Sequence, residues 1–179
     1  MRLSKLLDYH HRQVNRKAWA DLRQFSAALA SNGQQKTVSQ AVSPNLEITA
    51  LCHRSLIKNG PALLFENPAG FATPVLGNLF GNEQRVLTAL ELDSRQDLVK
   101  LGHDLAFLRN PHLPENRQSV LDAVPGFAPL AYVTPKQTDS APWQENVVEG
   151  PDVDLETLPI STCWPGDAAP LITWGMVIT

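Results

Sequence analysis

The sequence has little of what several protein classes require. It holds two cysteines, Cys52 and Cys163, too few and too far apart for a disulfide framework or a metal-ligand motif. No run approaches the roughly 18 apolar residues of a membrane span. The formal net charge is −3, so the whole chain lacks the positive balance typical of nucleic-acid-binding proteins. These absences favour a reduced, cytoplasmic protein without a nucleic-acid partner.

Common catalytic signatures are also missing. There is no glycine-rich phosphate loop, no His-Glu-x-x-His and no Cys-x-x-Cys. Two glycines in residues 77–81 have no lysine after them, which predicts a turn. Cys163 is interpreted as a small apolar residue rather than a nucleophile, because no histidine is near in sequence. We expect surface or structural roles for the five histidines, which are His10, His11, His53, His103 and His112.

What is present suits a globular α/β protein. The chain is 43% hydrophobic, which is enough for a core. Apolar spacing and stop signals predict helices that begin near residues 19, 43, 82 and 94, and strands over residues 36–42, 62–66 and 74–76. Two interior strands bracketed by helices indicate an α/β (α+β) domain over residues 18–110, built on a mixed sheet with flanking helices. Glu66, at a strand end, is a functional carboxylate or, in the preferred interpretation, stabilises a turn.

Two segments have weaker patterns. Residues 1–17 carry five basic side chains against Asp8, which suits a helical or disordered leader or, alternatively, a contact with a membrane surface. Residues 111–142 are a proline-rich connector with a short helix expected over residues 119–124.

Polar groups gather in an apolar, tryptophan-flanked stretch at the end of the sequence. Thr162, Asp167 and Thr173 supply them, while Gly166 and Gly175 permit close backbone approach. Convergent polar groups in an apolar wall are typical of a cofactor pocket. The apolar run over residues 171–178 is interpreted as a buried strand without a following partner, so we expect a longer protein.

These residues carry a family resemblance. Residues 154–175, with Leu-Pro-Ile, Thr-Cys-Trp-Pro-x-Asp-Ala-Ala-Pro and Leu-Ile-Thr-Trp-Gly, resemble the UbiD family of decarboxylases, above all the 3-octaprenyl-4-hydroxybenzoate decarboxylases of ubiquinone synthesis. Earlier segments agree. They are residues 21–25, 46–49, 60–68 and 74–81. The likeness runs from about residue 18 to the last residue, and the leader lies outside it.

The resemblance implies a non-oxidative carboxy-lyase that uses prenylated FMN with a divalent metal, usually manganese (Mn2+), and often potassium (K+). It implies an aromatic carboxylic acid as substrate, a homo-oligomer at full length, and peripheral contact with the inner membrane through a polyprenyl substrate. The family's fold has an N-terminal α/β domain, a split β-barrel cofactor domain and a C-terminal assembly domain. Residues 143–179 would open the barrel with its first strands.

The resemblance also limits the site residues. In family members the metal ligands, the phosphate-binding arginine and the acidic proton donor come later than residue 179, so no catalytic or metal-binding residue is assigned. Thr173, in Thr-x-Gly, matches a threonine near the flavin and is predicted to bind cofactor. Two hypotheses stay open: the N-terminal part of a decarboxylase, inactive alone, or a stand-alone module without catalysis that serves interaction or oligomerisation.

Overall fold

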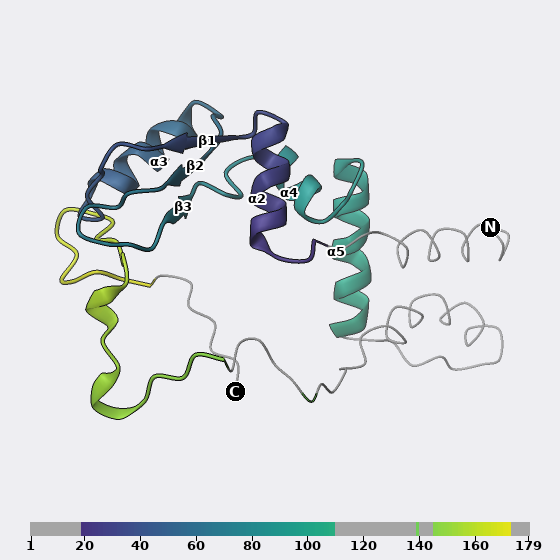
Figure 1. Ribbon diagram of the computed structural model, residues 1–179. Helices are drawn as coiled ribbons and strands as arrows, with labels where there is room; N and C mark the ends of the chain where they lie inside the picture. Colours follow the sequence, from purple (N-terminus) through teal and green to yellow (C-terminus); the bar gives the residue numbers. More distant parts are fainter. Residues whose placement is uncertain (1–18, 110–138, 140–144, 173–179) are drawn as a thin grey trace, which may run out of the picture. The chain divides into compact units, whose positions relative to one another are not determined.

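The computed structural model describes residues 19–109, 139 and 145–172 (Figure 1). These residues fall into two compact units: residues 19–89 with 148–172, and residues 90–109 with the remainder. The leader, the helix expected over residues 119–124 and most of the strand expected over residues 171–178 lie outside the described residues.

A small mixed sheet organises the first unit. Its strands are β1 (Gln35–Val38), β2 (Ala62–Phe65) and β3 (Val75–Gly77), in the order β1-β2-β3. β1 runs parallel to β2, with Gln35 opposite Ala62, and β3 runs antiparallel, with Gly77 opposite Leu63. The predicted mixed sheet is confirmed, and its central strand β2 is the most deeply buried of the three.

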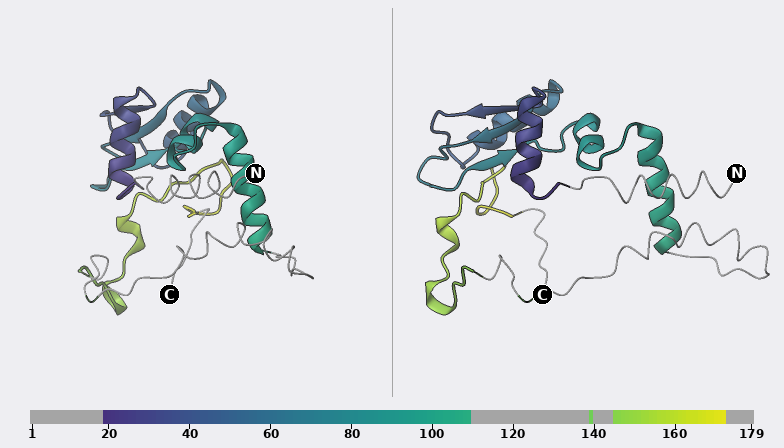
Figure 2. Two further views of the ribbon diagram at one scale, coloured as in Figure 1. Left: turned by 90° about the vertical axis from the view of Figure 1, so that its right-hand side faces the viewer. Right: turned by 45° about the vertical axis from the view of Figure 1, so that its right-hand side comes forward.

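Helices cover this sheet. α2 (Leu22–Ser31) contacts β1, and α3 (Glu47–Ile57) contacts β2 and β3. Ile48 of α3 packs with Val42, Leu63 and Phe65 in the core. Partly buried side chains surround this cluster, namely Val38, Leu51, Cys52 and Val75. Figure 2 shows the helices and the sheet from two further sides. Burial of each large apolar side chain stabilises the unit by about 1.5–3 kcal/mol.

Local hydrogen bonds set the helix ends. Asp21 begins α2, because its carboxylate accepts the backbone N–H of Gln24 at 2.7 Å. The expected start of α3 near residue 43 is wrong. The helix begins at Glu47, whose carboxylate accepts the N–H of Ser43 at 2.9 Å, and Leu46 before it has φ of 68°. A turn therefore replaces the first expected helical turn.

The first strand is shorter than expected over residues 36–42. It ends at Val38, and the chain then turns so that Val42 forms an isolated bridge with Pro68. The N–H of Val42 donates to Asn67 at 3.3 Å, and the N–H of Ala69 donates back to Val42 at 2.9 Å. Val42 therefore takes part in strand pairing, as its apolar side chain suggested, but in an isolated bridge beyond the end of β2 and not in β1.

Two further helices follow β3. α4 (Glu83–Ala89) lies in the first unit and α5 (Arg95–Arg109) in the second. Ser94 caps α5, because its hydroxyl accepts the N–H of Asp97 and donates to that residue's carboxylate. In the part of the chain that the structure describes, no helix has the length and apolar content needed to cross a membrane.

Candidate functional site

Residues 161–171, the terminal loop, lie beside the N-terminal end of α3. The carbonyl of Thr162 accepts the N–H of Leu46 at 3.0 Å, and Thr162 forms an isolated parallel bridge with Asn45. In Figure 1 this is the yellow segment that runs back to the sheet. The loop therefore meets the α/β core by its backbone.

Asp167 closes the terminal loop. Its Oδ2 accepts the N–H groups of Cys163 at 3.1 Å and Trp164 at 2.9 Å, while its own N–H donates to the carbonyl of Trp164 at 3.1 Å. Gly166 has φ of 100°, which only glycine adopts readily. One oxygen of this carboxylate is thus engaged in the turn.

The three residues of the predicted cofactor pocket have different positions. The backbone of Thr162 contacts Asn45 and Leu46 just before α3, and Asp167 bonds within its own turn. Thr173, the predicted cofactor-binding residue, lies outside the described residues. Its role and the convergence of all three groups stay predictions.

The neighbouring thiols and imidazoles do not form a common site. Cys163 is half-buried, and its Sγ lies 3.9 Å from the carbonyl of Ser161. His53 meets Trp164 edge-on, with ring centroids 5.7 Å apart. Cys52, next to His53, instead packs against Gly77, as the 100° step of a helix predicts. Across the described ranges, no group of three or more His, Cys, Asp or Glu residues could hold a metal.

The other candidates have structural surroundings. Glu66 accepts a hydrogen bond from the Ser39 hydroxyl at 2.8 Å, so it ties together the ends of β1 and β2. The Asn67 side chain donates to the Ser39 carbonyl at 2.7 Å in the same turn. His103 is exposed on α5. His10, His11 and His112 lie outside the described residues.

Sequence reasoning missed the one charged side chain that is buried within the described residues. Arg85 of α4 is 0% exposed. Its guanidinium donates to three backbone carbonyls, those of Leu79 at 2.9 Å, Gly60 at 3.0 Å and Asn78 at 3.0 Å. Burial lowers the pKa of Arg85, and the carbonyls replace part of its lost hydration. No apolar periodicity marks this position.

Arg85 also explains the glycine-containing stretch over residues 77–81. Two of its acceptors lie in that stretch, and Asn78 there adopts φ of 54°. The Asn78 amide donates to the Ser55 hydroxyl at 3.2 Å and to the Pro61 carbonyl at 3.0 Å. The predicted turn is confirmed, and it encloses a guanidinium rather than a phosphate.

Two family models match the chain in succession. The 3-octaprenyl-4-hydroxybenzoate carboxy-lyase N-terminal domain matches residues 26–105, and the Rift-related domain of the same carboxy-lyase matches residues 135–179. Together they cover most of the sequence in the order of one enzyme. The chain belongs to the UbiD family.

Two solved structures of a UbiD-class enzyme agree with this assignment. An evolved dimeric form of the UbiD-class enzyme HmfF from Pelotomaculum thermopropionicum, in complex with prFMN, is 28% identical over 85% of this chain, with a TM-score of 0.60. HmfF in complex with FMN is 29% identical over 83% of this chain, with a TM-score of 0.58. Vanillic acid decarboxylase from Sedimentibacter hydroxybenzoicus is 31% identical over 49%, with a TM-score of 0.45. The chain spans 20%, 28% and 30% of the lengths of the vanillic acid decarboxylase, the FMN complex and the prFMN complex, respectively.

The terminal loop and α3 belong to the matches of two different family domains. α3 lies in the match to the N-terminal domain, and residues 161–171 lie in the match to the Rift-related domain. The hydrogen bond from Leu46 to Thr162 therefore joins the two. The barrel strands expected from residue 143 have no counterpart among residues 145–172, where the structure has two 3-10 helices, η3 (Gly150–Asp152) and η4 (Leu155–Thr157).

Proposed function

We propose that this chain supplies the N-terminal domain and the opening of the Rift-related domain of a non-oxidative decarboxylase. The succession of the two family domains carries this proposal. The substrate is an aromatic carboxylic acid of the polyprenyl-4-hydroxybenzoate type, used in ubiquinone synthesis. The full-length enzyme is a homo-oligomer in the cytoplasm, in peripheral contact with the inner membrane through the polyprenyl chain.

The cofactor is prenylated FMN, with Mn2+ and K+ beside it. One support is that a structural neighbour, similar over 85% of this chain, is in complex with prFMN. When bound, the cofactor supplies an electron sink for the pair left by departing carbon dioxide. Thr173 would hold the flavin phosphate or order the metal shell through its hydroxyl.

The described residues position the chain and do not themselves carry out the chemical step of decarboxylation. Asn45 and Leu46, just before α3, hold the backbone of Thr162, and the sequence continues from the terminal loop to Thr173. The metal ligands and the acidic proton donor come after the matched region in the family. We therefore expect the 179-residue chain alone to release no carbon dioxide above background.

The test begins with the intact mass of the native polypeptide in its own cells. A polypeptide of that mass is then purified with prenylated FMN and Mn2+ and assayed for carbon dioxide release from 4-hydroxybenzoate-type acids. We expect a mass well above 19.7 kDa and turnover that the 179-residue chain lacks. A native mass near 19.7 kDa with neither flavin binding nor turnover would contradict the proposal and leave the interaction module as the function.

A further inference from the structure

We infer that two exposed surfaces of this chain bind each other between copies of the protein. One is the outer face of α3, and the other is the acidic segment of residues 148–158 in a second copy. The inference rests on the proposed function only in naming surfaces for its homo-oligomer, and it involves neither the cofactor nor decarboxylation.

The last turn of α3 exposes an apolar side chain between two cations. Ile57 keeps 70% of its surface accessible, the largest fraction among the exposed large apolar side chains that the structure describes. Arg54 lies one turn before it and Lys58 follows it, and both are exposed. Glu47, the one acidic residue of α3, lies at the other end of the helix. Cations at a helix C-terminus offset the helix dipole, but this does not account for the exposed isoleucine between them.

Trp164 extends this surface along the helix. Its ring meets His53 edge-on, with ring centroids 5.7 Å apart, and its side chain keeps 55% of its surface accessible. His53 lies one turn before Ile57, so both rings adjoin the isoleucine on one side of α3. The α3 face is therefore defined by His53, Arg54, Ile57, Lys58 and Trp164. An exposed apolar surface with a charged border is typical of an interaction site.

Residues 148–158 combine apolar side chains with the opposite charge. All of them are exposed. They include four carboxylates and no lysine, arginine or histidine, and the carboxylates are those of Glu149, Asp152, Asp154 and Glu156. Four large apolar side chains lie among them, with accessible fractions of 61% for Val148, 52% for Val153, 61% for Leu155 and 42% for Leu158. This acidic segment thus matches the α3 face in apolar character and complements it in charge.

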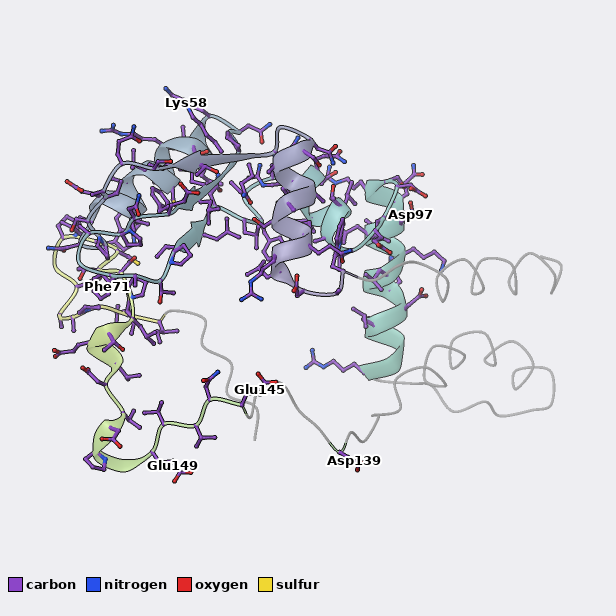
Figure 3. The ribbon with its side chains drawn as sticks, viewed as in Figure 1. Lys58, Phe71, Asp97, Asp139, Glu145 and Glu149 are labelled. Atoms are coloured by element: carbon purple, nitrogen blue, oxygen red, sulfur yellow. The ribbon has the colours of Figure 1, made fainter. Side chains whose placement is uncertain are left out.

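A second copy of the chain supplies each surface with its complement. Within one copy the two surfaces do not cover each other, because the side chains of both stay exposed, and Lys58 and Glu149 project from the ribbon (Figure 3). Every copy carries both surfaces, so association between copies satisfies both. Opposite charges around apolar side chains favour this pairing and fix its orientation. An anionic membrane would attract Arg54 and Lys58 but would leave the acidic segment without a partner.

Charge reversal tests the pairing in the native-length protein, with self-association measured by analytical ultracentrifugation. We expect the double variant Arg54→Glu, Lys58→Glu to raise the dissociation constant at least tenfold, because like charges would then meet across the interface. Glu149→Lys with Glu156→Lys should do the same. All four side chains are exposed, so circular dichroism should show unchanged folds.

Mixing the two double variants is the decisive step. Each reversed surface then meets a reversed complement on the other variant, so an equimolar mixture should associate as the wild type does. A mixture that stays as dissociated as its components would overturn the inference, even where each variant alone is weakened.

The matched control is Arg23→Glu with Arg109→Glu. These two side chains are also exposed, lie outside both surfaces and undergo the same change of charge. We expect the dissociation constant to change less than twofold. An equal effect of the control and of Arg54→Glu, Lys58→Glu would show a response to net charge and contradict specific pairing.

The outcomes also separate this inference from the proposed function. An oligomer that neither reversal weakens overturns the inference and leaves the decarboxylase standing. A monomeric wild type overturns both the inference and the homo-oligomer, while carbon dioxide release still tests decarboxylation. Binding to phosphatidylserine vesicles that Arg54→Glu, Lys58→Glu abolishes, with self-association unchanged, would overturn the inference and assign the α3 face to an anionic membrane.

Discussion

Cys52 of α3 packs its sulfur directly against Gly77, the last residue of β3. A Cβ added to Gly77 would overlap Sγ of Cys52, with Cε2 of Phe65 a further 3.8 Å neighbour. This close approach lets the helix lie on the sheet over Phe65, which is fully buried. The glycine is required here for space, since its φ is not in the left-handed region.

Gly77→Ala is therefore expected to destabilise the protein by about 1–3 kcal/mol, because the core has no room for the methyl group. Urea unfolding followed by circular dichroism measures the loss. In the Cys52→Ala background the methyl group fills the space left by the sulfur, so the double variant should lose less stability than the sum of the single variants. Strict additivity would contradict the contact.

Cys52 also makes stability depend on pH in the alkaline range. Burial raises the pKa of the Cys52 thiol from 9.0 to about 11. Above pH 9 the unfolded chain ionises while the folded protein keeps the neutral thiol, so this contribution is complete below pH 9 and is lost as the pH rises toward 11. Urea midpoints at pH 8 and 10.5 should fall more in wild type than in Cys52→Ala. Equal falls would contradict the raised pKa.

Arg85→Met should cost about 3 kcal/mol or more of unfolding free energy. Methionine keeps an apolar stem but leaves the carbonyls of Gly60 and Leu79 without their Arg85 donor, at about 1–3 kcal/mol for each unsatisfied buried group. The carbonyl of Asn78 also loses Arg85 but still accepts the N–H of Gly81 at 3.3 Å. The control is Arg23→Met, whose side chain is 94% exposed and which should change stability by less than about 0.5 kcal/mol. Similar urea midpoints for both variants would show that Arg85 is not needed.

Two variants of Asn78 separate the effect of backbone conformation on stability from the effect of hydrogen bonding. Asn78→Ala and Asn78→Gly both lose the bonds to Ser55 and Pro61. The φ of 54° strains alanine but not glycine, so Asn78→Ala should be less stable than Asn78→Gly by about 1 kcal/mol in urea unfolding. The opposite order would mean that the turn relaxes to another conformation.

The helices and strands could be predicted from the sequence because their signals are local. Helical spacing marked Phe25 and Leu29, and a short apolar run marked β2. The start of α3 could not be predicted in this way. Ser43-Pro44 resembles a helix start, yet Glu47 bonds back to Ser43 and Leu46 donates to Thr162, more than a hundred residues later.

The candidate site was predicted only in outline. The family motif predicted a site within residues 162–175, and the model of the Rift-related domain matches this region. Which atom each residue uses was not predictable, since a carboxylate such as Asp167 serves a pocket or a turn with equal ease in a linear pattern. Figure 3 shows the exposed carboxylates Glu145 and Glu149 projecting from the chain.

The sequence by itself determined the family, the order of the elements and the mixed α/β class, because apolar periodicity and motif spacing are properties of neighbouring residues. Tertiary structure alone decided that Arg85 is buried, that Gly77 must lack a side chain and that Thr162 meets Leu46. Each of these depends on groups brought together by folding, whose hydrogen bonds and contacts do not exist until distant segments meet.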